Sequence, residues 1–294
     1  MEDDVDRLKE RRGAYARRIT SLARIDCDSG IGREIKAAYE AIPREKFVGA
    51  PPWRVFSPEE QFQGISDDPA VLYQDVLITL LAGKGLNNGQ PSLHAMCLNA
   101  LDPRVGEHAV HVGAGTGYYT AILAMLVGES GQVDAYEIEP ELARQAAANL
   151  AGFPQVQTHG RSGAEAPLPE CDVIYVNAAC AEPLGVWLNA LCCGGRMLFP
   201  LEPEGEAGQM LLVTKQSNEA YAARFLCGVQ FVGCIGAQEP GAVRALEAAY
   251  RKGNWTSVKS LHRNDVPDDS CWCAGRGWWL STRHPGINIE RSGL

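Results

Sequence analysis

The sequence predicts an α/β fold with a doubly wound sheet, an antiparallel edge to that sheet and an appendage after it. Two observations lead to this prediction. From residue 107 to residue 201, short apolar runs alternate with segments of helical periodicity, the pattern of parallel strands with helices on their faces. Between the first of these strands and its helix stand Gly113, Gly115 and Gly117. A strand, a glycine-rich loop and a helix in this order are typical of Rossmann-like sheets.

Length and composition are those of a globular protein. With 294 residues, 46% of them hydrophobic, the chain can bury a substantial core. The formal net charge of -9 disfavours binding to a phosphate backbone, so nucleic acid is not an expected partner. The opening MEDDVDRLKERR has no apolar stretch of a signal peptide, and no uncharged apolar run reaches about 18 residues. We therefore expect a cytoplasmic protein that does not enter a membrane.

The ten cysteines do not form the pattern of a disulfide scaffold. They are dispersed, and several lie in apolar runs, so most are expected to be reduced core thiols. Cys271 and Cys273 lie close together, but they lack the two-residue gap and the second cluster of a structural zinc site. No metal is expected.

Residues 1–70 are predicted to be a helical and loop segment of the main domain. Apolar residues at helical spacing predict an amphipathic helix over 5–25 and a second helix over 33–42. The stretch 51–68 is rich in proline and polar residues and is expected to be a loop. The helical pattern returns over 91–101.

The core of the fold is predicted over residues 71–238. Strands are expected at 108–112, 132–136, 155–158, 172–176 and 196–200. Helices are expected between them at 118–127, 140–150 and 183–191. The later apolar runs 210–214 and 223–232 have no convincing helix between them, and so predict an antiparallel pair at one edge.

Residues 239–294 are predicted to be a tryptophan-rich appendage. A helix is expected over 240–251, and four of the six tryptophans follow it. A disordered tail is rarely so aromatic, so we expect this one to fold back onto the main domain.

The glycine loop predicts a ligand that the backbone approaches closely. Tyr118 stands at the third position of the dinucleotide fingerprint G-x-G-x-x-G, and the loop has no basic residue to meet a pyrophosphate. The amino-acid end of S-adenosylmethionine does not need a basic residue in the loop, since loop amides can hold its carboxylate. Glu137 ends the next strand, twenty residues after Gly117, where a carboxylate can accept hydrogen bonds from both ribose hydroxyls.

Several ordered phrases resemble the protein-L-isoaspartate (D-aspartate) O-methyltransferase family over roughly residues 25–215. They are IPREKFV (42–48), YQD (73–75), GQP (89–91), VGAGTGYYTAILA (112–124), YEIEPELA (136–143), CDVIYVNAA (171–179) and GGRMLFPL (194–201). The resemblance implies a class I methyltransferase fold with S-adenosyl-L-methionine as cofactor. It also implies methyl transfer to the side carboxylate of an isoaspartyl residue, the one that is not part of the chain linkage.

The same resemblance indicates the cofactor-binding residues. They are Gln90, His111, Gly113, Ala114, Gly115, Gly117, Glu137, Ile138, Arg161, Ser162 and Asn177. Two of these positions depart from the family pattern. His111 stands where an acid is usual two residues before the first glycine, and Arg161 or Ser162 stands where an aspartate is expected to meet adenine.

The acceptor loop is the third departure. The family phrase T-I-S-x-P aligns with NNGQP (87–91), so that Asn87 replaces the threonine and Gly89 replaces the serine. Asn87, Asn88 and Gly89 are the candidate catalytic residues, because the two amides can donate and accept hydrogen bonds and the glycine leaves space. The alternative is ordinary Asn-Asn-Gly turn chemistry. His94 is expected to be a surface or packing residue.

An ionised carboxylate attacks a sulfonium methyl group directly, so the reaction needs alignment and exclusion of water rather than a base or a metal. The expected acceptor is a carboxylate of a peptide, a protein or a small molecule. We further predict that Trp272, Trp278 and Trp279 pack against the main domain and help to roof the acceptor site; an oligomer contact is the alternative.

Three hypotheses about function stay open. The first is a methyltransferase of the isoaspartyl type, and the second is a methyltransferase for a different peptide or small molecule. The third is a non-catalytic protein that binds S-adenosylmethionine. A nicotinamide oxidoreductase is a distant fourth, and the oligomeric state is not predicted.

Overall fold

The computed structural model describes residues 2–58, 62–203, 205–217 and 220–286, with the side chains of 2–7 and 62 left aside. The chain forms two compact units, Met1–Gly163 and Ala164–Leu294. This boundary falls within the predicted core 71–238, and the three-segment division by composition stays a prediction. Each unit is described by itself.

Three helices begin the first unit: α1 (Glu2–Leu22), α2 (Gly30–Ala41) and, later in the chain, α3 (Pro91–Leu101). All three were predicted, α3 to the residue. Helix α2 begins where Ser29 Oγ accepts a hydrogen bond from the Gly32 amide at 3.2 Å, an N-cap that satisfies one of the free amides of the first turn. Helix α1 packs on α2 and α3, and the fully buried rings of Tyr15 and Tyr39 lie 5.9 Å apart between the first two helices.

The segment 51–68 is not a loop, so that prediction is wrong. Strands β1 (Trp53–Ser57) and β2 (Phe62–Ser66) pair in antiparallel fashion, and β3 (Leu77–Leu81) and β4 (Leu86–Asn87) complete a sheet of order β2-β1-β3-β4. Side chains of β1 alternate between buried and exposed, the two-residue period of a half-buried strand. The prolines that favoured a loop flank this strand rather than interrupt it, so its paired residues keep their backbone N–H groups. Short 3₁₀ helices lie at Arg44–Phe47, Pro69–Tyr73 and Ala82–Lys84.

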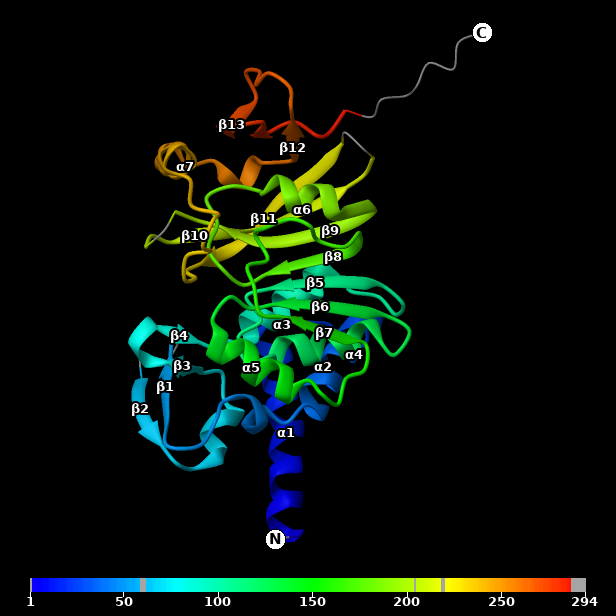
Figure 1. The fold of residues 1–294 in the computed structure, drawn as a ribbon, viewed down its shortest axis with the longest axis vertical. Coiled ribbons are helices and arrows are strands. Elements are labelled where there is room, and N and C mark those ends of the chain that lie inside the picture. Colours follow the sequence, from blue (N-terminus) through cyan, green and yellow to red (C-terminus); the bar gives the residue numbers. More distant parts are fainter. Residues whose placement is uncertain (1, 59–61, 204, 218–219, 287–294) are drawn as a thin grey trace. The chain divides into compact units, whose positions relative to one another are not determined.

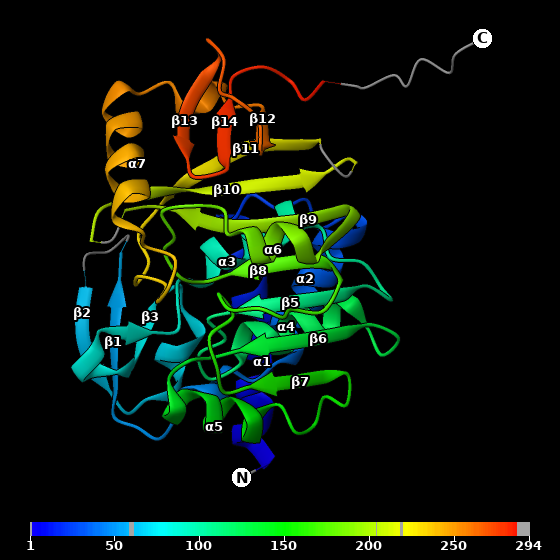
Figure 2. The same cartoon turned by 45° about the horizontal axis from the view of Figure 1, so that its top comes forward.

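The first unit also contains three parallel strands side by side (Figure 2). They are β5 (His108–Val112), β6 (Gln132–Tyr136) and β7 (Val156–His159), with helices α4 (Tyr118–Val127) and α5 (Pro140–Asn149) between them in sequence. Helix α4 packs on β5 and β6, and α5 packs on β7. Strands β5 and β6 and helix α4 match the predicted bounds, α5 ends one residue earlier than predicted, and β7 is shifted by one residue at both ends. This part of the α/β prediction is confirmed.

The second unit continues with parallel and then antiparallel strands. Strands β8 (Cys171–Val176) and β9 (Leu191–Leu201) are parallel, with α6 (Gly185–Ala190) between them in sequence. Strands β10 (Gly208–Lys215) and β11 (Tyr221–Val229) follow in antiparallel pairing with β9 and with each other. The predicted antiparallel pair is therefore confirmed.

The predicted pair is not the edge of the sheet, however. The tail adds α7 (Pro240–Lys252), a 3₁₀ turn at Trp255–Ser257, and strands β12 (Ser260–Arg263), β13 (Cys271–Gly275) and β14 (Trp278–Ser281). Strand β12 pairs with β11, then β14 with β12 and β13 with β14, all antiparallel. Figures 1 and 2 show these short strands beyond β11, and α7 packs on β13.

The tryptophans explain why the tail is ordered. The Trp272 ring lies 5.3 Å from Phe225 and 5.3 Å from Tyr250, and its indole N–H donates to the Gly253 carbonyl at 2.9 Å. Trp279 stacks on His262 at 4.0 Å. Buried indoles with hydrogen-bonded N–H groups stabilise a small core of their own. The prediction that the tail folds back is confirmed; its role as a roof stays a prediction.

All ten cysteines are free thiols. In the described ranges, no group of three or more histidine, cysteine, aspartate or glutamate side chains is arranged to hold a metal ion. Nor does any helix there have the length and apolar character needed to cross a membrane.

Candidate active site

The glycine loop joins β5 to α4 in a conformation that other residues rarely adopt. Gly113, Gly115 and Gly117 have φ values of +77°, +57° and +95°. A β-carbon at Gly117 would also lie 2.7 Å from Cδ1 of Leu150, so a larger residue is excluded there by lack of space as well as by the positive φ. Backbone geometry therefore requires glycine at all three positions, and packing also requires it at Gly117.

The loop amides serve the protein itself. The amides of Gly113 and Ala114 both donate to the Tyr136 carbonyl, at 2.9 and 3.0 Å, and the Gly117 amide donates to the Ala114 carbonyl at 2.9 Å. An amide that already donates inside the fold is not open to a ligand carboxylate. At these three positions the loop amides are used within the fold, and the expectation that loop amides hold the amino-acid end of the cofactor stays a prediction.

Glu137 is the centre of the candidate cofactor site. It follows β6 directly and is buried, with Oε2 accepting the Gly115 amide at 2.7 Å and Oε1 accepting the Glu139 amide at 2.9 Å. Burial raises the pKa of this carboxyl group above its usual value, and the two amide hydrogen bonds oppose that rise. A carboxylate offers about four acceptor positions, so an oriented carboxylate with two of them used still fits a pair of ribose hydroxyls.

The predicted adenine contacts lie after β7. The guanidinium of Arg161 lies 4.8 Å from the centre of the Tyr136 ring and donates to the Ser162 carbonyl at 3.3 Å. Ser162 is buried, while Ile138, next to Glu137, is exposed. The first unit therefore brings the glycine loop, Glu137 and the 159–163 loop to the same ends of three neighbouring parallel strands, which is where ligands bind in such sheets.

His111 replaces the usual acid with a neutral ring. It is fully buried in β5, and its Nδ1 lies 2.8 Å from Oγ1 of Thr120 in the first turn of α4. Burial lowers the pKa of His111 to about 3, so the ring is uncharged at neutral pH. Asn177, the last predicted cofactor residue, belongs to the second unit, where it follows β8 and is half-buried.

The two asparagines of the acceptor loop have different surroundings. Asn87 is exposed, and its Oδ1 accepts the Gly89 amide at 2.8 Å, which is turn chemistry. Asn88 is buried: its Oδ1 accepts the Ile78 amide at 2.8 Å and lies 3.4 Å from Nη2 of Arg44. Asn88 therefore fixes the loop to β3, and its carboxamide oxygen is directed into the fold.

Arg44 was not among the predicted site residues, although it lies in the IPREKFV phrase. Its fully buried guanidinium donates to the carbonyls of Leu72, Gln74 and Val76 at 2.7, 3.1 and 2.6 Å. A buried charge is favourable only when it is hydrogen-bonded in this way. Arg44 thus holds the chain that leads into the acceptor loop.

Asp75, in the YQD phrase, is the second residue missed as a site residue. Its buried carboxylate accepts hydrogen bonds from Nε2 of Gln90, the amide of Ser92 and Oγ of Ser92, at 2.8, 2.8 and 2.6 Å. These bonds satisfy an amide at the start of α3 and orient Gln90. The side-chain amide of Gln90, which is predicted to touch the cofactor, is therefore fixed by its hydrogen bond to Asp75.

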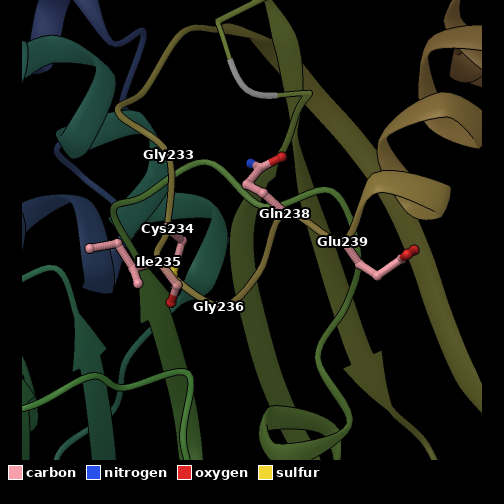
Figure 3. Close-up of a pocket in the computed structure, with 6 residues that line it drawn as sticks. All are labelled: Gly233, Cys234, Ile235, Gly236, Gln238 and Glu239. Atoms are coloured by element: carbon pink, nitrogen blue, oxygen red, sulfur yellow. The ribbon is translucent and has the colours of Figure 1, made fainter.

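A separate hollow of about 380 Å³ lies in the second unit, between β11 and α7 in sequence (Figure 3). Its lining is Gly233, Cys234, Ile235, Gly236, Gln238 and Glu239. The amide of Gln238 donates to the carbonyls of Ala179 and Glu202, and Oε2 of Glu239 accepts the Ala242 amide at the start of α7. These side chains serve the local fold, and the candidate site remains the one in the first unit.

Comparison with known proteins gives a consistent result. A family model described as protein-L-isoaspartate(D-aspartate) O-methyltransferase matches residues 28–239. The protein-L-isoaspartate O-methyltransferase 2 of Marinobacter nauticus is 32% identical over 211 residues, covering 70% of this chain and 85% of the relative. The protein-L-isoaspartate O-methyltransferase of Ignicoccus hospitalis is 31% identical over 207 residues, covering 69% and 89%.

Solved structures support the fold. A protein-L-isoaspartate O-methyltransferase structure superposes with a TM-score of 0.61 at 21% identity, covering 80% of this chain and 69% of the other. A Plasmodium falciparum structure, described as a protein of the same type in complex with S-adenosyl-L-homocysteine, gives 0.60 at 18% identity, covering 76% and 97%. The predicted class I methyltransferase fold is therefore confirmed.

Proposed function

Because the chain belongs to the protein-L-isoaspartate(D-aspartate) O-methyltransferase family, we propose that it is an enzyme that methylates a carboxylate of a peptide or protein, with S-adenosyl-L-methionine as cofactor. The observation that carries this proposal is the environment of Glu137. Backbone amides fix both of its oxygens directly beside the glycine loop. A ribose with two free hydroxyls is the partner that such a carboxylate fits.

The residues of the site have separable tasks. Glu137 binds the ribose, the stacked Arg161 and Ser162 border the adenine, and the glycine loop admits the amino-acid end. When bound, the cofactor supplies a methyl group on a positively charged sulfur. An ionised carboxylate is already a competent nucleophile at neutral pH, so the remaining task of the chain is to hold that carboxylate in line and keep water away.

The acceptor loop performs that task from a fixed position. Asn88 is bound to β3, Arg44 holds the segment before it, and Asp75 holds Gln90 and Ser92 after it. A loop anchored on both sides can present a constant surface to an acceptor, which is what an in-line displacement requires. We propose the free carboxylate of an isoaspartyl residue as the acceptor, since the relatives are named for it.

The test is incubation of the full chain with methyl-labelled S-adenosylmethionine and three acceptors: an isoaspartyl peptide, the matched aspartyl peptide and a cell extract. We expect label in the isoaspartyl peptide and little in its aspartyl counterpart. Label in neither peptide but in an extract component would replace the isoaspartyl acceptor by another. No label anywhere, with cofactor binding intact in calorimetry, would indicate a non-catalytic protein.

A paired variant tests the role given to Glu137. Glu137→Gln replaces a charged acceptor by a neutral amide and should weaken cofactor binding about 10- to 100-fold, because a hydrogen bond to a charged group contributes about 1.5–3 kcal/mol. Glu129→Gln, an exposed acid after α4, is the matched control and should bind as the wild type does. Equal affinities for the two variants would show that Glu137 does not hold the cofactor.

A further inference from the structure

Two segments of the second unit run side by side, one after β8 and the other between β11 and α7 in sequence. Ala179 of the first and Gly233 of the second form a parallel β-bridge, and the Cys234 amide donates to the Ala179 carbonyl at 2.8 Å. Residues one step beyond such a bridge are neighbours whose side chains point to the same face. Cys180 and Cys234 stand in these two positions.

The spacing of this cysteine pair suits a disulfide. The two thiol groups are hydrogen-bonded to each other, and neither is oxidised. A disulfide needs Cα atoms about 4.4–6.8 Å apart, and neighbouring strands lie about 4.8 Å apart. Cys180 is also fixed from its other flank, because its amide donates to the Pro200 carbonyl at 3.0 Å and its carbonyl accepts the Glu202 amide at 2.9 Å. Backbone hydrogen bonds of both segments therefore hold the pair in place.

Access to the two cysteines differs. Cys234 lines the hollow of about 380 Å³ in the second unit, and Figure 3 shows it among the other lining residues. Its exposed fraction is 7%, whereas that of Cys180 is 0%. Gly233 and Gly236 contribute no side chain to this lining. A small molecule that enters the hollow therefore comes into contact with Cys234 and not with Cys180.

The charges of the two sulfur atoms differ as well. The hydrogen bond from the Cys180 thiol lowers the pKa of Cys234, although burial opposes this. Burial raises the pKa of Cys180 well above its usual value, and the neighbouring Cys234 sulfur and the carboxyl groups of Glu202 and Glu182 add to this rise. Because the thiolate is the reactive form of cysteine, Cys234 is the nucleophile of the pair and Cys180 keeps its proton.

We propose that Cys234 is a site of reversible oxidation by hydrogen peroxide, and that Cys180 is the second thiol, which closes a disulfide with it. The Cys234 thiolate attacks one peroxide oxygen, the O–O bond breaks, and the departing hydroxide takes up the proton that Cys234 released on ionising. The Cys180 sulfur then attacks the resulting sulfenic acid, and its proton leaves with the hydroxyl oxygen as a second water. Two thiols are oxidised to one disulfide, and one peroxide is reduced to two waters. This site does not depend on the proposed function.

The first experiment locates the disulfide in the full chain. Reduced protein, freed of reductant, is treated with one equivalent of hydrogen peroxide, its remaining thiols are blocked with N-ethylmaleimide, and it is digested without reduction for mass spectrometry. Two of the ten thiols should be lost. The peptides that contain Cys180 and Cys234 should be joined, two hydrogens lighter than their sum, and dithiothreitol should separate them. Recovery of both cysteines in alkylated form, or a disulfide from either one to another cysteine, would overturn the proposal.

The second experiment assigns the two roles with serine variants and dimedone, which reacts with sulfenic acids. Cys180→Ser keeps a hydroxyl that can donate to the Cys234 thiolate but cannot close the disulfide, so a sulfenic acid should persist on Cys234 and form a dimedone adduct. Cys234→Ser should give neither the disulfide nor an adduct on Cys180. Cys193→Ser removes an exposed thiol of the same unit and is the control, which should form the disulfide as the wild type does.

The outcomes of the two experiments are distinct. A dimedone adduct on Cys180 in Cys234→Ser as abundant as that on Cys234 in Cys180→Ser would show that the assigned order of reaction is wrong. The melting temperature of each reduced variant is compared with that of the wild type, and the wild-type disulfide decides the proposal if a variant does not fold. Both experiments measure thiols rather than methyl transfer, so their failure would leave the proposed function unaffected.

Discussion

The carboxylate of Asp75 is expected to be essential to the order of the acceptor loop, and Asp75→Asn tests this with almost no change in volume. The native carboxylate accepts three hydrogen bonds, from Gln90 and twice from Ser92, at 2.6 to 2.8 Å. An asparagine side chain has one acceptor oxygen, and its NH₂ group must then face one of these donors. The variant therefore loses the charge on every bond and at least one bond altogether.

The size of the effect follows from this count. Hydrogen bonds to a charged group contribute about 1.5–3 kcal/mol each but are not additive within one network, so we expect a loss of about 3 kcal/mol in the free energy of unfolding. For a unit of this size, 1 kcal/mol corresponds to about 2–4 °C, so the melting temperature should fall by roughly 6–12 °C. Methyl transfer should fall as well, because residues 90–92 lose their anchor.

The assay is thermal denaturation followed by circular dichroism, with Asp269→Asn as the control. Asp269 has a side chain that is 80% exposed and pairs with Arg283 at the surface, so its replacement should shift the melting temperature by no more than about 2 °C. A shift for Asp75→Asn as small as that of the control would refute the view that this buried carboxylate holds the loop.

Three other outcomes are expected. Gly163→Ala should cost about 1–3 kcal/mol in urea unfolding because its β-carbon would lie 2.7 Å from Val112, whereas Gly160→Ala, whose nearest contact would be 3.8 Å, should behave like the wild type. Burial alone would raise the pKa of Asp134, but hydrogen bonds from the histidines of β5 and β7 hold this pKa below its usual value. The carboxylate therefore contributes its full stabilisation above about pH 4 and loses it as the pH falls further. Between pH 6 and pH 2.5, the wild-type protein should lose more stability than Asp134→Asn does. Trp272→Ala should lower the free energy of unfolding of the second unit by about 3–5 kcal/mol, and a loss below 1 kcal/mol would contradict its place in the core.

The fold was predictable where one periodic signal was strong. Helix α4 is apolar on nearly every side and β5 and β6 are short apolar runs, so their bounds follow from the sequence alone. Strands β1 and β2 were missed because flanking prolines outweighed a short alternation. Strands β12 to β14 are short, and β13 and β14 are rich in tryptophan and cysteine. They are strands because β12 pairs with β11, β14 with β12 and β13 with β14, which sequence spacing does not report.

The site was predictable only in part. Glycines with positive φ and an acid at a strand end have fixed positions relative to a strand and a helix, so Gly113, Gly115, Gly117 and Glu137 could be proposed from spacing. Arg44 and Asp75 could not be interpreted in this way, because a charged residue is buried only where distant segments supply its hydrogen bonds, and sequence spacing does not report such contacts.

The nature of the methylated product tests the central claim most directly. Carboxyl methyl esters release methanol in mild alkali, whereas methyl groups on nitrogen or sulfur do not. After reaction of the wild-type chain with labelled S-adenosylmethionine and the isoaspartyl peptide, the account predicts that the peptide-bound label becomes volatile methanol on alkaline treatment. Label that stays on the peptide after that treatment would contradict methyl transfer to a carboxylate.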